Sequence, residues 1–81
     1  MSKAQFKPGD RVSVKDCQAT RNSWILSERI GQLGIIDIGD DNSMSPERHL
    51  RRSGTPPIGW VNIVYQDGEE LSTGAQWIEH K

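Results

Sequence analysis

The amino-acid sequence predicts an all-β domain, a small five-stranded barrel with two long loops, the second of which contains a short helical turn. Three observations predict this fold class. Apolar and polar residues alternate in short stretches, as in residues 11–15. Turn residues separate the stretches, and Asp67-Gly68 is a strong two-residue hairpin signal. The length of 81 residues fits a single domain, residues 1–81.

We expect five strands, and each follows from its own local pattern. The first begins after a Pro8-Gly9 turn and places Val12 and Val14 on one face. Residues 74–76 form a tight turn before the last strand. The expected strands cover residues 11–15, 33–38, 60–66, 69–73 and 77–80. The expected core is Val12, Val14, Ile36, Ile38, Val61, Ile63 and Ile78.

Two long connections join these strands. Residues 16–32 contain Trp24-Ile25-Leu26, so we expect this segment to fold over one end of the barrel, with a helical turn between residues 23 and 30. The second connection, residues 39–58, contains Ser45-Pro46, which is typical of a capping hydroxyl followed by proline at the first helical position. We therefore expect one to two helical turns over residues 46–52.

Composition limits the functions that fit this chain. Only 33% of the residues are apolar and the net charge is -1, which argues against bulk binding of a polyelectrolyte. The single cysteine, Cys17, excludes an internal disulfide. The first residues lack the apolar stretch of a signal peptide, and no segment could span a membrane. We expect a cytoplasmic protein without a membrane partner.

Catalytic and metal-binding motifs are not found. The two histidines have no metal-ligand spacing with another histidine or with cysteine. Residues 37–42 are acidic, but a calcium loop would need glycine where Asn42 stands and glutamate where Arg48 stands. We expect an exposed turn there. With no nucleophile elbow and no phosphate-binding glycine loop, the sequence predicts no enzyme, no cofactor and no metal.

The order of strands and loops, with residues 9–12 followed by Gly31-x-x-Gly34-x-Ile36, resembles the SH3-like barrels. It is similar to the KOW-type pattern of transcription and ribosomal proteins, except that the connection between the two halves is longer. The layout is also similar to small SH3-like proteins that accompany electron-transfer complexes, and to type II dihydrofolate reductase. The latter resemblance implies a homotetramer whose pore binds folate and NADPH through a Val-Gln-Ile-Tyr strand, where this chain has Glu-Leu-Ser-Thr at residues 70–73.

The second long connection supplies the first candidate site, a basic segment formed by Arg48, Arg51 and Arg52. At helical spacing, Arg48 shares a face with Arg51 or Arg52. Their guanidinium groups could grip phosphate or carboxylate oxygens with paired hydrogen bonds, so we expect an anion or nucleic acid to bind there. The alternative is a solvated or mobile loop.

A second candidate site is an apolar patch on the outside of the central strands. If Ile36 and Ile38 face the core, Leu33 and Ile35 face outward, and Trp60 and Val64 do so on the third strand. Tryptophan is enriched at binding hot spots. The predicted patch comprises Trp24, Leu33, Ile35, Trp60 and Val64. Two alternatives remain: the 17–32 loop covers this face, or Trp24, Trp60, Tyr65 and Trp77 form an aromatic cage for a cation.

The sequence therefore predicts a small non-catalytic binding module that mediates protein–protein interaction or self-association, with a homo-oligomer as one form. Nucleic-acid binding is the alternative, through residues 48–52 with Arg11, Lys15 and Arg21 as flanking contacts. An oligomeric pore enzyme like type II dihydrofolate reductase is a distant third.

Overall fold

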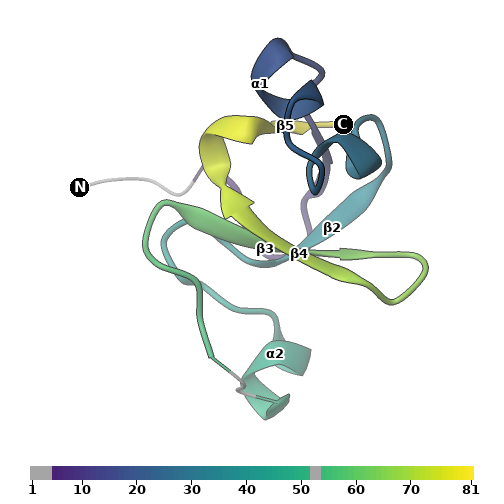
Figure 1. Ribbon diagram of the computed structural model, residues 1–81. Helices are drawn as coiled ribbons and strands as arrows, with labels where there is room; N and C mark the ends of the chain where they lie inside the picture. The colour runs from purple at the N-terminus through teal and green to yellow at the C-terminus, as the bar shows by residue number, and fades with distance from the viewer. Residues whose placement is uncertain (1–4, 52–53) are drawn as a thin grey trace.

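The computed structural model describes residues 5–51 and 54–81, and these form a mostly β structure (Figure 1). Five antiparallel strands make one sheet in the order β4-β3-β2-β1-β5. The strands are β1 (Arg11–Val14), β2 (Gly34–Ile38), β3 (Trp60–Tyr65), β4 (Glu70–Gly74) and β5 (Ile78–His80). All five predicted strands are confirmed. Within the described residues β4 and β5 do not pair with each other, so the sheet is not closed.

The hairpin between β3 and β4 forms where the sequence predicts it. Gly68 has a φ of +86°, a conformation that glycine adopts without the steric cost other residues meet. Its amide donates to the carbonyl of Tyr65 at 3.0 Å, and the side chain of Asp67 accepts from the amide of Glu69 at 3.0 Å. The turn is thus closed by its own backbone and by the aspartate.

The helices differ in part from those expected. The predicted turn over residues 23–30 is reduced to a 3₁₀ turn, η1 (Ser27–Arg29), and an unpredicted helix, α1 (Gln18–Arg21), precedes it. The buried hydroxyl of Thr20 holds α1 in place by donating to the carbonyls of Lys15 and Cys17 at 2.6 and 2.9 Å. The predicted turn at residues 74–76 is the 3₁₀ turn η2 (Ala75–Trp77).

The seven predicted core residues are all buried, each at most 2% exposed. Alternation along β1 and β3 explains the burial of their members, and of Ile36 on β2, because successive side chains of a strand point to opposite faces. The register between β2 and β3 shifts after Ile36, so Ile38 pairs with Asn62 and is buried outside the main core cluster. Phe6, Tyr65, Leu71 and Ala75 complete the core, and Leu26 and Ile30 from the first long loop pack against its edge. The inner face of the sheet is thereby filled.

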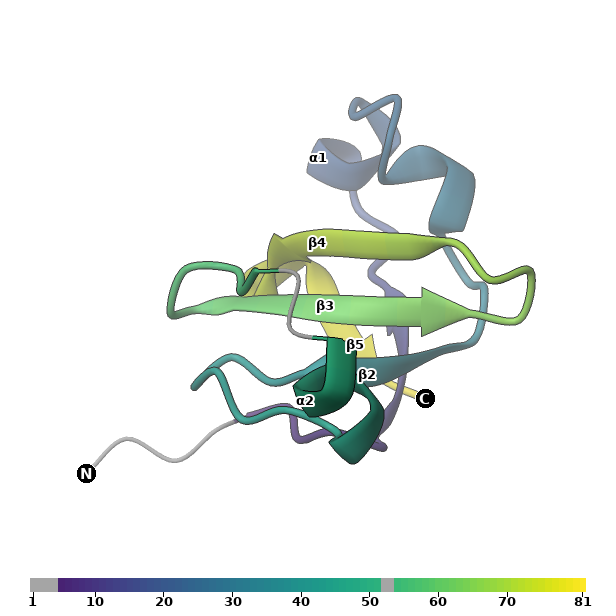
Figure 2. The same ribbon diagram turned by 90° about the horizontal axis from the view of Figure 1, so that it is seen from below.

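The helix predicted in the second long loop is α2 (Pro46–Arg51), and it lies against the outer face of β2 and β3 (Figure 2). Ser45 caps it, since its hydroxyl accepts a hydrogen bond from the amide of Arg48 at 3.2 Å. Arg52, also expected in this helix, lies outside the described residues. In the described parts of the chain, no helix has the length and apolar character needed to cross a membrane.

Candidate functional site

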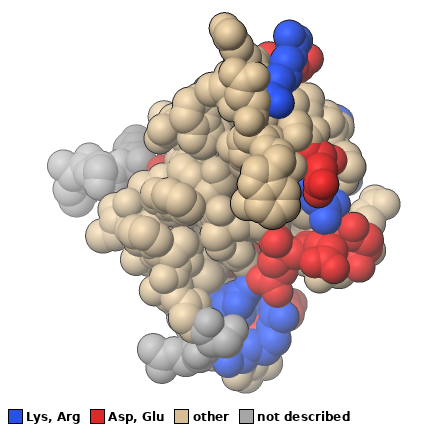
Figure 3. All heavy atoms as spheres, viewed as in Figure 1, with Lys and Arg blue, Asp and Glu red and all other residues tan. Residues whose placement is uncertain are grey.

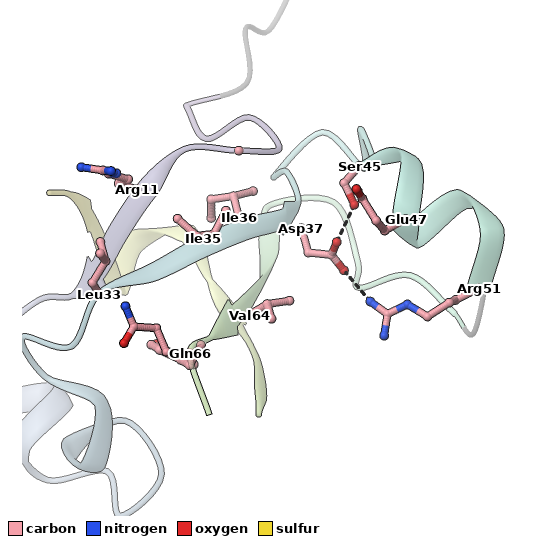
Figure 4. A pocket seen from close by; sticks show the side chains of 12 residues that line it. Arg11, Leu33, Ile35, Ile36, Asp37, Ser45, Glu47, Arg51, Val64 and Gln66 are labelled. Carbon is pink, nitrogen blue, oxygen red and sulfur yellow. Dashed lines mark hydrogen bonds and ion pairs between the residues drawn. The ribbon is translucent and has the colours of Figure 1, made fainter. Parts of the chain in front are cut away.

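A groove of about 600 Å³ lies on the outer face of the sheet, beside α2 (Figure 4). Leu33, Ile35 and Val64 supply its apolar floor. Ile35 and Val64 are paired directly across β2 and β3, and Ile35 stays 40% exposed. Volumes of 300–1,000 Å³ with a mostly apolar lining are usual for ligand sites in proteins. The groove therefore has the size and lining of a binding site.

Charged side chains stand on both walls of this groove. Arg11 rises from β1, where it is paired in register with Ile35. Glu47 and Arg51 come from α2 on the opposite wall (Figure 4). An apolar floor between polar walls lets a ligand bury an aliphatic group while its charged groups stay near water.

A buried cluster of charges fixes α2, and hence one wall, to the sheet. Arg48 is only 5% exposed, and its Nε donates to Oδ2 of Asp37 on β2 at 2.5 Å. Its Nη2 donates to Oε1 of Glu70 on β4. One guanidinium thus bridges two strands from above, which a planar group with five donors can do.

The prediction that Arg48 faces an external anion is corrected by this placement. The three arginines have no acidic residue between them in sequence, but the fold brings Asp37 and Glu70 against Arg48. Arg51 also lies 3.8 Å from Oδ2 of Asp37 and 3.6 Å from Oε2 of Glu70. At 5% exposure, and with both carboxylates on its guanidinium, Arg48 belongs to the ion pairs of the fold and not to an open basic surface. Nucleic-acid binding itself stays a prediction.

Asp37 is the centre of the cluster, and its place also corrects a prediction. It was expected in an exposed acidic turn, but it is buried in β2 beneath α2. Burial opposes its ionisation, yet hydrogen bonds from Ser45 at 2.6 Å and from Arg48 outweigh burial and hold the pKa of Asp37 below its ordinary value. Ile38 also belongs to β2 and is buried, as is Gly39. The expected turn is confined to the residues that follow, where the side chain of Asp41 accepts from the amide of Ser43.

Asn62 joins the remaining members of the cluster. Its side-chain amide donates to Glu70 at 2.7 Å and to Asp37 at 3.3 Å, while its oxygen accepts from Ser72 at 2.9 Å. The hydrogen bond from Asn62, with the charge of Arg48 nearby, holds the pKa of Glu70 below its ordinary value. This cluster was not predicted from the sequence. A signal was present, because Asp37 and Asn62 are polar residues inside otherwise apolar strands.

The surface around α2 shows the same mixture of charges. In Figure 3 positive and negative side chains lie next to one another at the lower part of the molecule, where Figure 1 places α2. Because these opposite charges are neighbours, their electrostatic potentials largely cancel farther from the surface. Salt screens the remainder beyond about 8 Å at physiological ionic strength. The described surface in this view has no continuous positive face.

The structure divides the predicted apolar patch into three parts. Leu33, Ile35 and Val64 meet in the groove. Trp60 points to the same face of β3, but Asn62 and the buried cluster lie between it and Val64. Trp24 sits between α1 and η1 and is 78% exposed, so it neither joins the groove nor covers it.

The aromatic cage is not assembled among the described residues. Tyr65 is buried in the core, where the guanidinium of Arg29 lies 4.4 Å from its ring centre. The one ring contact that the structure shows there joins Phe6 and His80, not two of the four expected cage residues. Across residues 5–51 and 54–81, no group of three histidine, cysteine or carboxylate side chains is placed to hold a metal ion.

Comparison of the chain with protein-family models, with curated proteins and with solved structures gives no significant match.

Proposed function

We propose that this chain is a non-catalytic protein-interaction module of the SH3-like barrel type, and that it binds its partner in the groove beside α2. Three features support the fold type: the meander of strands, the tight β3–β4 hairpin and the 3₁₀ turn η2 before β5. The groove is the observation that carries the proposed function. Its floor consists of aliphatic side chains on a rigid sheet, and its walls carry charge.

The rigidity of the groove supports this proposal. The floor residues lie on paired strands, and the α2 wall is held by the Arg48 cluster and by the Ser45 cap. A site whose walls are already in place binds with a small loss of conformational entropy. Apolar surface left exposed on such a rigid element is typical of a partner-binding surface.

The experiment that tests this function selects binders from a random linear-peptide library displayed on phage. Peptides selected on the wild type are then measured by calorimetry against Ile35→Glu, which puts a charge on the groove floor. The matched control is Ile58→Glu, the same change at an 80% exposed residue outside the groove. We expect binding roughly 30-fold weaker for Ile35→Glu, the size of a hot-spot loss, and no change for the control.

Circular dichroism and urea unfolding of both variants establish that each still folds. The proposed function is wrong if the wild type binds neither a peptide nor a second copy through the groove, or if the selected peptides bind folded Ile35→Glu as tightly as the wild type.

A further inference from the structure

Two charged side chains at the groove have no partner within the described chain. In residues 5–51 and 54–81, neither the Arg11 nor the Glu47 side chain makes a hydrogen bond or an ion pair. Both are exposed. Arg51, the third charge on the walls, already lies within 4 Å of Asp37 and Glu70. Arg11 and Glu47 are therefore the two wall charges that no residue of the described chain pairs with, one positive and one negative.

These two groups stand on opposite walls with the apolar floor between them. Arg11, Ile35 and Val64 follow one another in register across β1, β2 and β3. Glu47 lies on α2, above the end of β2 that carries Asp37 (Figure 4). A ligand seated on Ile35 and Val64 therefore has a positive group on its β1 side and a negative group on its α2 side.

We propose that the groove takes a single peptide segment in which one aliphatic residue is flanked by an acidic residue and a basic residue. The aliphatic side chain lies on Ile35 and Val64, the acidic residue faces Arg11, and the basic residue faces Glu47. This inference rests on the proposed function and names the chemistry of the partner.

Shape favours a peptide over a second copy of this chain. The site is hollow, and two copies that met groove to groove would enclose the space between them and lose the packing contacts that stabilise an interface. A narrow segment fills the hollow and brings both of its charges to the walls.

The wall charges contribute more to the choice of partner than to the affinity. Burial of the aliphatic side chain provides most of the binding free energy, while opposite charges across an interface set orientation and reject segments of the wrong sign. Reversing one wall charge should therefore change which peptides are selected, while the groove still binds peptides.

The same peptide library tests this inference in separate selections on the wild type, on Arg11→Glu and on Glu47→Lys. The matched controls make the same charge changes at exposed residues outside the groove, Lys7→Glu and Glu79→Lys. Wild-type peptides should carry an acid and a base around an aliphatic residue. Arg11→Glu should replace the acid by a base, and Glu47→Lys should replace the base by an acid.

Calorimetry should show wild-type peptides binding each groove variant about tenfold or more weakly, with no loss for either control. Selected peptides without this charge pattern, or peptides that bind Arg11→Glu and Glu47→Lys as well as the wild type, would overturn the inference. If, in that case, the selected peptides bind the wild type and only Ile35→Glu loses binding, the inference is wrong but the proposed function still holds. If no peptide is selected and light scattering shows a dimer that Ile35→Glu dissociates, the occupant is a second copy and the inference is wrong.

Discussion

Arg48 shows how one residue acquires a role that its type alone does not indicate. In the sequence it belongs to a basic segment, and in the fold it is the counter-ion of two carboxylates from different strands. A buried ion pair adds little net stability compared with well-packed apolar residues, because both charges lose their hydration. Removing one partner is costly, however, because the other charge then stays buried without compensation.

We therefore expect Arg48→Ala to lower the free energy of unfolding by about 3–5 kcal/mol, because Asp37 keeps a buried charge without its main partner. The matched control is Arg51→Ala, whose side chain is exposed and whose ion pairs are long, and we expect a loss below about 1 kcal/mol. Urea unfolding measures both values. Equal small losses in the two variants would show that the cluster does not hold α2.

At the scale of elements, α2 is attached to the sheet mainly through polar contacts. Pro46 and the Ser45 cap define where it begins, but a helix of six residues is too short to be stable alone in water. Its apolar residue Leu50 is 88% exposed, so apolar packing of that side chain does not hold it. The contacts of Arg48 and Ser45 with Asp37 do.

This attachment predicts a dependence on pH. The folded pKa values of Asp37 and Glu70 lie below their ordinary values of 3.8 and 4.5. A carboxyl with a lowered pKa stabilises the fold above its unfolded pKa, and this contribution is lost as the pH falls through the folded pKa. We expect the free energy of unfolding to fall below about pH 4.5 and to keep falling through the lowered values.

Urea unfolding from about pH 7 to about pH 3 tests this dependence. Asp37→Asn should flatten part of the acid fall, since it removes one of the titrating groups. Glu79→Gln, which removes an exposed carboxylate outside the cluster, is the control and should leave the profile unchanged. Parallel profiles for all three proteins would contradict the link between the cluster and acid stability.

The β3–β4 hairpin depends on the backbone conformation of a single residue, Gly68. Gly68→Ala places a side chain at a φ of +86°, and we expect a loss of about 1–2 kcal/mol from the steric cost of that conformation. Glu69→Ala, one residue further along the exposed turn, is the matched control. Thermal melts measure both. A negligible loss for Gly68→Ala would mean that the turn tolerates a side chain there, and an equal loss for the control would mean that the positive φ is not the cause.

The whole molecule rests on a small core on the inner face of the sheet. Ile63 is fully buried and pairs with Ile36 on β2 and with Leu71 on β4. We expect Ile63→Ala to cost about 2–5 kcal/mol in urea unfolding, because it removes packed volume that the neighbouring strands cannot refill. The control Ile58→Ala removes the same atoms from an exposed residue. A loss below about 1 kcal/mol for Ile63→Ala would contradict its place in the core.

Local pattern was sufficient to predict the strands, the hairpin and the core. Val12 and Val14 alternate with polar neighbours, and Asp67-Gly68 fits a tight turn, so their positions follow from interactions within a few residues. The cap of α2 also follows from Ser45-Pro46. The outward direction of Ile35 and Val64 followed from the inward direction of their neighbours, which is why part of the groove could be predicted.

The sequence by itself determined which residues form strands, which apolar residues of β1 and β3 face the core, and where the chain turns, because these depend on side-chain periodicity and on backbone preferences. Only the tertiary structure decided that Arg48 is buried, that Asp37 leaves the exposed turn, and that Trp24 and Trp60 lie apart from the groove. The first two outcomes depend on charges 11 and 22 residues apart along the chain meeting in space. Electrostatic pairing acts across such distances in sequence, and no local pattern records which partner a charge will meet.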